Sequence, residues 1–176
     1  AASDVYKRQV GLYKQGLLHD MSKYSPTEFW VGAKYYQGTR SPNNAEREDI
    51  GYSSAWLHHK GRNKHHYEYW IDYSMQALPG GMAPVPMPDK YIAEMIMDRI
   101  AASKVYMGGE YTDRSPLDYY YQGTDRAPIH PETKAKLLYV LEMLAEEGEE
   151  KTFRFIKEEL VQHKRCMDWH QLEKAE

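Results

Sequence analysis

Residues 16–23 read Gly-Leu-Leu-His-Asp-Met-Ser-Lys, an apolar run that ends in an imidazole and a carboxylate, His19 and Asp20, with Lys23 three residues further on. Imidazole and carboxylate groups are ligands that divalent transition metals accept from proteins. One His-Asp pair carries little weight, since average amino-acid usage produces about one such pair in every few hundred residues. The stretch gains weight from two later histidine pairs, at residues 58–59 and 65–66, and from Asp98. We therefore expect a fold that brings these side chains together.

The composition is that of one globular domain. The chain has 176 residues, of which 41% are hydrophobic and 28% charged, so it can bury a core. A single cysteine, Cys166, excludes an internal disulfide and suits a reducing cytoplasm. The formal net charge of −3 argues against a nucleic-acid polymer as the main partner. No apolar run approaches the roughly 20 residues of a membrane span, so we expect a cytoplasmic protein without a membrane partner, and a homo-oligomer stays open.

Residues 1–9, AASDVYKRQ, correspond to the translation of a transposase adapter used in preparing sequencing libraries. Chance does not readily produce a match of this length, so we set these residues aside and place one helical domain over residues 10–176. On this interpretation the natural sequence before Val10 is missing and the domain is truncated at its N-terminus. An apolar face around Leu12 and Leu17 then loses the helix that would cover it.

Start and stop signals predict helices along the rest of the chain. Ser25-Pro26-Thr27-Glu28 combines an N-cap serine, a proline at the first helical position and a glutamate at the capping-box position. The predicted helices cover residues 10–21, 25–37, 41–59, 66–75, 89–107, 131–147 and 149–169, with a short segment at 115–123 and a Pro- and Gly-rich loop at 78–88. We find no strand pattern, so the predicted fold class is all-α.

Asp98 is the charged residue that the helical period places inside. On the helix predicted over residues 89–107 it shares a face with Tyr91, Met95, Ala102 and Val105. A buried carboxylate needs a partner, either a basic side chain or a metal ion shared with the histidines. Arg99 points about 100° away on an ideal helix, so a basic partner would have to come from elsewhere, and we favour the metal.

The four histidines at residues 58–59 and 65–66 lie within nine residues, where one predicted helix ends and the next begins. Ligands that converge from two helix ends suit a metal site. Lys60, Arg62 and Lys64 add positive charge to the turn between the pairs. This turn either binds an anion or is an ordinary solvated basic turn.

Together these residues resemble the HD-domain superfamily of metal-dependent phosphohydrolases, all-helical proteins with the ligand order His, His-Asp, His, His, Asp. Three longer strings, GLLHDMSKYSPTEFWVGAKYYQG, WLHHKGRNKHHYEYW and DRIAASKVYMG, are similar to an uncharacterised HD-like family of bacteria and phages. The similarity spans residues 10–121. It implies an HD-domain-like helical bundle.

The resemblance assigns His19 and Asp20 to the His-Asp positions, Asp98 to the last ligand, and His58 or His59 with His66 to the later histidines. Lys23 corresponds to the lysine that contacts the substrate phosphate in some members. The superfamily's first histidine lies on the preceding helix, which here falls before Val10. The Gly-Tyr-Pro segment of the branch that hydrolyses cyclic dinucleotides is absent after the histidines, which disfavours that branch.

The expected activity is hydrolysis of a phosphoester, of the phosphatase or nucleotidase type, on a small phosphorylated substrate. One or two divalent transition-metal ions, among Fe, Mn, Zn, Co and Ni, would lower the pKa of a water that Asp20 orients for attack on phosphorus. Lys23, Arg62 and Lys64 would neutralise charge on the phosphoryl oxygens. Two alternatives stay open: an HD-like di-iron oxygenase, and a non-catalytic metal- or anion-binding module with an incomplete site.

Overall fold

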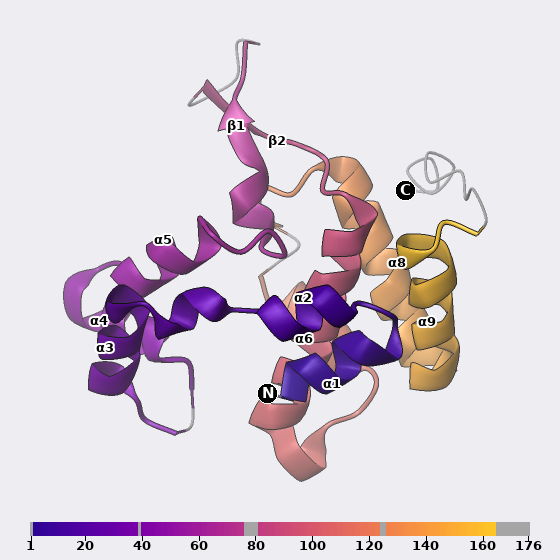
Figure 1. Ribbon diagram of the computed structural model, residues 1–176, viewed down its shortest axis with the longest axis horizontal. Helices are drawn as coiled ribbons and strands as arrows, with labels where there is room; N and C mark the ends of the chain where they lie inside the picture. Colours follow the sequence, from indigo (N-terminus) through magenta and orange to yellow (C-terminus); the bar gives the residue numbers. More distant parts are fainter. Residues whose placement is uncertain (1, 39, 76–80, 124–125, 165–176) are drawn as a thin grey trace.

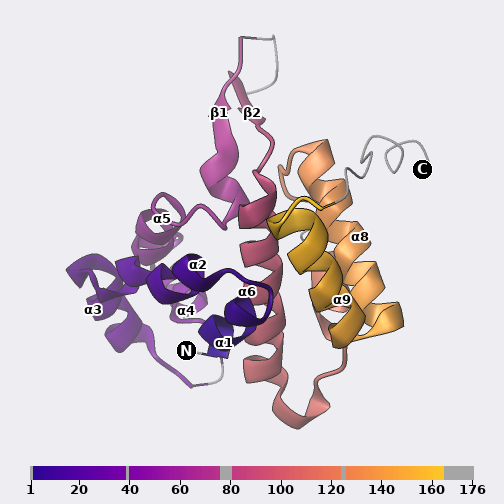
Figure 2. The same cartoon turned by 45° about the vertical axis from the view of Figure 1, so that its right-hand side comes forward.

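A computed structural model describes residues 2–38, 40–75, 81–123 and 126–164, and this part of the chain is almost entirely helical, as predicted. The long helix α6 (Asp89–Met107) runs through the middle of the molecule. On one side of it lie α1 (Ala2–Gln9), α2 (Tyr13–Leu18), α3 (Pro26–Tyr35), α4 (Pro42–Ile50) and α5 (Ser54–Lys60), and on the other lie α8 (Pro131–Glu147) and α9 (Glu149–Phe155) (Figures 1 and 2). Shorter helical segments are η1 (Met21–Tyr24), η2 (Tyr67–Trp70), η4 (Gly108–Glu110), α7 (Ser115–Tyr121) and the π-helical turn η6 (Ile156–Val161).

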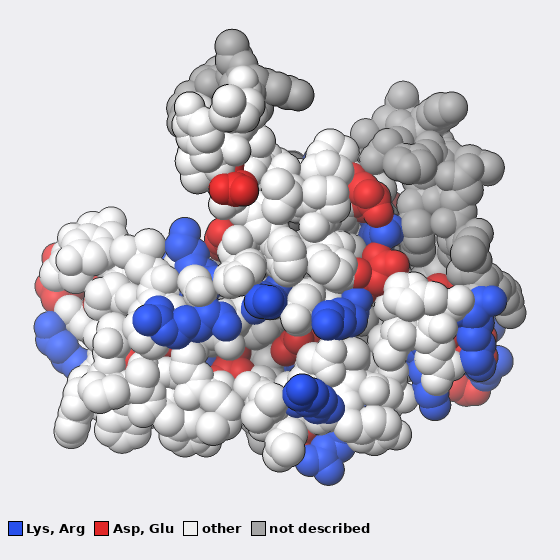
Figure 3. All heavy atoms as spheres, turned by 45° about the horizontal axis from the view of Figure 1, so that its top comes forward, with Lys and Arg blue, Asp and Glu red and all other residues white. Residues whose placement is uncertain are grey.

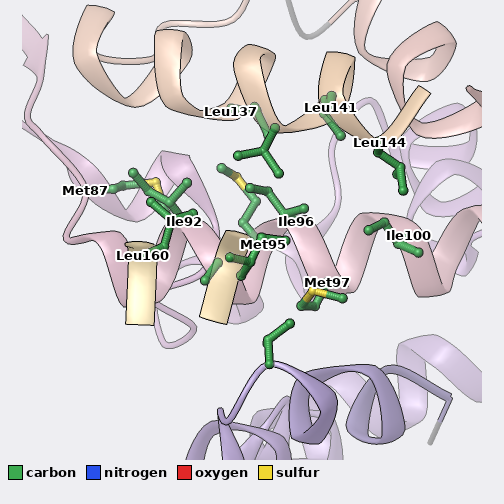
Figure 4. Packing of buried hydrophobic residues seen from close by; sticks show 14 of the residues in the cluster. Met87, Ile92, Met95, Ile96, Met97, Ile100, Leu137, Leu141, Leu144 and Leu160 are labelled. Carbon is green, nitrogen blue, oxygen red and sulfur yellow. The ribbon is translucent and has the colours of Figure 1, made fainter. Parts of the chain in front are cut away.

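Helix α6 is buried around most of its circumference, which identifies it as the centre of the core. Every residue from Ile92 to Met97 is buried. Figure 4 shows that Ile92, Ile96 and their neighbours meet Leu137, Leu141 and Leu144 of α8, with Leu160 of η6 beside them. Burial of each such aliphatic side chain contributes about 1.5–3 kcal/mol. Glu94 is the one charged residue in this buried run, and its position leads to the site described below.

The bounds of α6 and α8 agree with the prediction, whereas other elements are shorter than expected. The helix predicted over residues 41–59 is two helices, because Gly51 ends α4 at a positive φ of 84° and Ser53 then caps α5 by accepting a hydrogen bond from the Trp56 backbone N–H at 3.0 Å. The helix predicted over residues 10–21 is confined to α2. The helix predicted over residues 149–169 is present as α9 and η6. Its expected continuation to residue 169 lies outside the described residues, as does Cys166.

A small hairpin replaces the helix predicted over residues 66–75. After η2, strand β1 (Ile71–Tyr73) pairs antiparallel with β2 (Met82–Pro84), and Ile71 lies opposite Pro84. The prediction of no strand is therefore wrong here. Aromatic and β-branched residues such as Trp70, Ile71 and Tyr73 favour strands, and their partner lies in the segment that was expected to be only a loop.

Residues 2–9, which the sequence analysis set aside, form α1 and pack against α6. Lys7 is completely buried there, and Leu12, which was expected to be exposed, is 2% exposed. Leu17 is 69% exposed, as expected. The origin of residues 1–9 stays a prediction. Within the described ranges, no helix combines the length and the apolar character that a membrane span requires.

The buried Glu46 carboxylate fixes the start of α5, the helix that carries His58 and His59. It accepts hydrogen bonds from the Ser53 and Ser54 hydroxyls, each at 2.6 Å, and from the Ala55 backbone N–H at 3.4 Å. Burial alone would raise the pKa of Glu46, but these hydrogen bonds outweigh it and lower the pKa. The carboxylate therefore stabilises the fold above its usual titration range, and this contribution is lost as the pH falls through the lowered pKa.

We expect Glu46→Gln to lower the free energy of unfolding at pH 7 by about 2 kcal/mol, because hydrogen bonds to a charged group are weakened or lost. The variant should also lose part of the acid dependence of stability, since it no longer titrates. Urea unfolding at pH 7 and at pH 4 measures both effects. Glu142→Gln, on the exposed side of α8, is the matched control and should change stability by no more than about 0.5 kcal/mol. Equal stability of the two variants would contradict this role for Glu46.

Candidate metal centre

His19 and Asp20 lie at the sharp turn between α2 and η1. His19 ends α2 with an extended ψ of 130°, and Asp20 adopts the left-handed conformation with φ 55° and ψ 25°. Aspartate is one of the few non-glycine residues that tolerate this conformation. The turn directs both side chains inward, where they are 6% and 9% exposed.

The Asp20 carboxylate lies at the centre of the polar cluster. Its Oδ2 lies 3.1 Å from His19 Nε2 and 2.5 Å from Lys23 Nζ. Its Oδ1 lies 3.3 Å from His59 Nε2 and 3.5 Å from His65 Nε2. One carboxylate thus faces three imidazoles that come from α2, from α5 and from the turn after α5.

Two further groups complete the cluster. His66 Nε2 lies 2.9 Å from His59 Nε2. Asp98, on α6, places Oδ1 2.9 Å from His19 Nε2 and 3.5 Å from the Lys7 ammonium. Of the two partners that the sequence offered Asp98, the basic side chain from elsewhere is therefore present as Lys7, and His19 is a histidine with which Asp98 could share a metal ion. The shared face predicted for α6 does not extend to Val105, which is 64% exposed.

Two buried glutamates contact the Nδ1 atoms of the imidazole rings. Glu94 Oε1 lies 3.2 Å from His19 Nδ1 and 3.4 Å from His65 Nδ1, and Glu28 Oε2 lies 2.8 Å from His59 Nδ1. A carboxylate on Nδ1 fixes that proton and leaves the Nε2 lone pair free, which is the arrangement behind most metal-binding histidines. All three rings accordingly direct Nε2 toward Asp20.

The ligand atoms form two groups that can each hold a metal ion, and within each group they lie within 4.8 Å of one another. The first group comprises Asp20, His59, His65 and His66, and the second comprises His19, His65 and Asp98. Among the described residues, Asp20 Oδ1 and His65 Nε2 are buried without a hydrogen-bond partner. Buried polar atoms without a partner are costly, so a cation between them would satisfy both. Mixed imidazole and carboxylate ligands suit a divalent transition metal.

Protonation states favour metal binding at His65 and His66, whereas His19 is protonated at pH 7 and would have to lose a proton to bind a metal ion. Burial lowers the pKa of His65 to about 2 and that of His66 to about 3, so both rings are neutral at pH 7 and offer lone pairs. Burial alone would raise the pKa of Asp20 and Asp98, but hydrogen bonds from His19 and nearby positive charges outweigh it, so both pKa values are lowered. Burial alone would also lower the pKa of His19, but hydrogen bonds to Asp20, Asp98 and Glu94 outweigh it and raise the pKa to about 10.

A cleft of about 690 Å³ opens beside the cluster and gives access to it. Asp20, His59, His66 and Asp98 line its floor, and Lys23 lies at its side. Its walls include the aromatic rings of Phe29, Tyr36, Trp56 and Tyr106. The Trp56 ring stacks on His59 with centroids 5.6 Å apart. A ligand in this cleft would contact both the aromatic side chains and the polar cluster.

Three residues predicted for the site lie elsewhere. His58 lies outside both ligand groups, because its Nδ1 contacts Glu28 Oε1 at 2.7 Å. Arg62 donates to the His58 carbonyl at 3.2 Å, and Lys64 lies over the Tyr69 ring at 5.7 Å. Neither basic residue lines the cleft, which agrees better with a solvated basic turn than with an anion site. In the face shown in Figure 3, basic and acidic side chains are interspersed.

His65 was one of the four candidate histidines but received no ligand position, and Glu28 and Glu94 were not predicted for the site. Glu28 was interpreted as the return partner of a capping box, but only the Ser25 half of that box forms, with Ser25 Oγ accepting from the Glu28 backbone N–H at 3.4 Å. Its carboxylate turns to the histidines instead. Glu94 precedes Asp98 by four residues, one helical turn, and this spacing within an apolar helix was the signal that could have revealed it.

We expect His65→Ala to weaken Zn²⁺ binding by roughly 10- to 100-fold, because His65 contributes to both ligand groups. His58→Ala is the matched control and should change the affinity by less than about threefold, since His58 lies outside both groups. Calorimetric titration with Zn²⁺ measures both variants. A larger loss from His58→Ala than from His65→Ala would show that these rings have been assigned the wrong way round.

Comparison with known proteins adds one relationship. A family of unknown function, DUF5662, matches residues 4–143, a range that includes most of α1 and all the ligands described above. No curated protein and no solved structure matches the chain. Because the match covers well over half of the sequence, the chain belongs to the DUF5662 family.

Proposed function

We propose that this protein is a metal-dependent phosphoester hydrolase. The observation that carries the proposal is the convergence of the Nε2 atoms of His19, His59 and His65 on Asp20, with carboxylates fixed behind the rings. The resemblance to HD-domain phosphohydrolases supports it, because the His-Asp pair, a later histidine and the helical aspartate lie in one cluster. The cleft beside that cluster would give a substrate access to it.

A divalent ion held by Asp20, His59, His65 and His66 would polarise a phosphoryl oxygen and lower the pKa of the attacking water. The protein's own contribution is positioning. Asp20 Oδ1, which has no hydrogen-bond partner among the described residues, can accept a hydrogen bond from that water and orient its lone pair toward phosphorus. Glu28 and Glu94 keep the imidazoles in the required tautomer.

Lys23 is the group best placed to contact the substrate phosphate. Its side chain is 63% exposed, lines the cleft and reaches the Asp20 carboxylate. The ammonium can therefore move from Asp20 to a phosphoryl oxygen without a change in the backbone. Charge placed at the developing oxyanion accelerates phosphoryl transfer.

The aromatic side chains that line the cleft can contact the part of the substrate that is attached to the phosphate. Trp56 shields His59 and His66 from solvent, with ring centroids 5.6 and 4.7 Å away. An organic group attached to the phosphate would lie against these rings and displace water from them. This arrangement favours small phosphomonoesters with an apolar or planar portion over inorganic pyrophosphate.

A di-iron oxygenase is the second candidate, favoured by one observation: His65 belongs to both ligand groups and Asp20 faces both, as in a dinuclear centre. Iron loading distinguishes the two functions. A charge-transfer or mixed-valence signal with oxygen consumption would support the oxygenase, and its absence together with phosphate release would support the hydrolase.

We expect the Mn²⁺- or Zn²⁺-loaded protein to release phosphate from p-nitrophenyl phosphate or from nucleoside monophosphates. Removal of the metal by EDTA should abolish the release, and His59→Ala should abolish it even with metal added. Phosphate release measured across a substrate panel provides the test. A protein that binds metal tightly but turns over none of these esters would contradict hydrolysis and indicate a binding module.

Lys23→Ala should change the stability by only about 0.5 kcal/mol, and so the melting temperature by a few degrees, because the side chain is largely exposed. It should reduce turnover roughly 100-fold, a loss typical of removing one group that stabilises transition-state charge. Thermal melts and steady-state assays measure the two effects. Lys14→Ala, an exposed lysine of α2, is the control and should leave both unchanged. Loss of folding with unchanged turnover per folded molecule would reverse the assignment.

A further inference from the structure

Lys7 is a completely buried lysine beside the second ligand group. It comes from α1, and its ammonium lies 3.5 Å from Asp98 Oδ1 and donates to the Ser3 hydroxyl. Ser3 in turn donates to the same Asp98 oxygen at 2.9 Å. Buried lysines are rare unless they are paired, so this ammonium is held in place by the carboxylate that the second group would offer a metal.

The Asp98 oxygen that faces the cluster, Oδ1, already has three polar neighbours. Oδ1 faces Ser3 Oγ and His19 Nε2, each at 2.9 Å, as well as the Lys7 ammonium. A divalent ion bound through Oδ1 would lie about 2 Å from it and hence close to the Lys7 ammonium. Two cations at such a distance repel each other strongly where water is excluded.

The Lys7 side chain is completely enclosed by the helices around it. Its helix packs against α6, and α2 closes over it at Gly16, where an added Cβ would lie 3.5 Å from Lys7 Cβ and 2.5 Å from Asp4 Oδ1. Lys23 differs, because it pairs with Asp20 from the solvent side and is 63% exposed. A metal ion can therefore displace Lys23 from Asp20 but cannot readily displace Lys7 from Asp98.

The first ligand group differs from the second, because two of its buried atoms lack a hydrogen-bond partner among the described residues. These atoms are Asp20 Oδ1 and His65 Nε2. His59 and His66 bring their Nε2 atoms to 2.9 Å from each other. An ion bound between these atoms and Asp20 Oδ1 would displace only the exposed Lys23 ammonium from Asp20.

We propose that the Lys7 ammonium acts as a built-in cation at the His19–His65–Asp98 group, so that this chain binds one divalent ion, at Asp20, His59, His65 and His66, and not two. The inference rests on the metal centre of the proposed function. Lys7 lies in the segment that the sequence analysis assigns to an adapter, so the effect belongs to the chain as printed above.

The test is the number of Zn²⁺ ions bound per chain, measured by calorimetric titration and by metal analysis after gel filtration. The unaltered protein should bind one equivalent. Lys7→Met, which keeps the length of the side chain and removes its charge, should bind two. Addition of Zn²⁺ should raise the melting temperature of Lys7→Met more than that of the unaltered protein, because the released Asp98 carboxylate gains a cation. Lys14→Met, the same change at an exposed position of α2, should bind one.

Two equivalents in the unaltered protein would overturn the inference, and this measurement needs no variant. One equivalent in folded Lys7→Met would also overturn it, and Lys7→Ala tests the same charge if the methionine variant does not fold. These outcomes leave the hydrolase proposal standing, since they count ions and not turnover. No bound ion in either protein would instead overturn the metal centre and both proposals with it.

Discussion

The Asp20 carboxylate lies buried at the turn between α2 and η1, within 3.5 Å of three imidazoles and of the Lys23 ammonium. A buried carboxylate is costly unless positive charge or donors compensate it. Here the compensation comes from groups on separate elements, so the charge can be accommodated only when α2, α5 and the segment after α5 are in place together. The left-handed backbone of Asp20 adds a local cost of order 1–3 kcal/mol, and such strain tends to persist where the surrounding structure requires it. The same features that make the site costly to form also leave it ready for a cation.

Helix α6 links this site to the core. One of its faces packs Ile92, Ile96 and Ile100 against α8 (Figure 4), while Glu94 and Asp98, one turn apart, face the histidines. Residues at this spacing lie on the same side of a helix, so the packing that fixes the rotation of α6 also aims both carboxylates. Glu94 then orients His19 and His65 together, and Glu28 does the same for His58 and His59 from α3. The geometry of the site thus depends on these two buried acids, which together hold the ligand rings His19, His59 and His65.

The sequence predicted those parts of the structure that depend on local signals. The all-α class and the bounds of α6 and α8 followed from caps and helical period, which act within one element. The hairpin was missed because β1 pairs with residues in a segment rich in proline and glycine, and such pairing is not local. The choice within each histidine pair could not be made either: adjacent residues of a helix point about 100° apart, and only tertiary packing decides that His59 faces Asp20 while His58 faces Glu28. Lys7 could not be anticipated, because its partner Asp98 is distant in sequence and residues 1–9 had been set aside.

The central claim is that imidazole nitrogens from His59, His65 and His66, together with Asp20, bind a divalent ion. X-ray absorption at the zinc edge of protein loaded with one equivalent of Zn²⁺ tests it most directly, because imidazole rings give a characteristic multiple-scattering pattern. The account predicts about three imidazole ligands with Zn–N distances of about 2.0–2.1 Å, completed by oxygen. A shell made only of oxygen, or one without imidazole scattering, would contradict it.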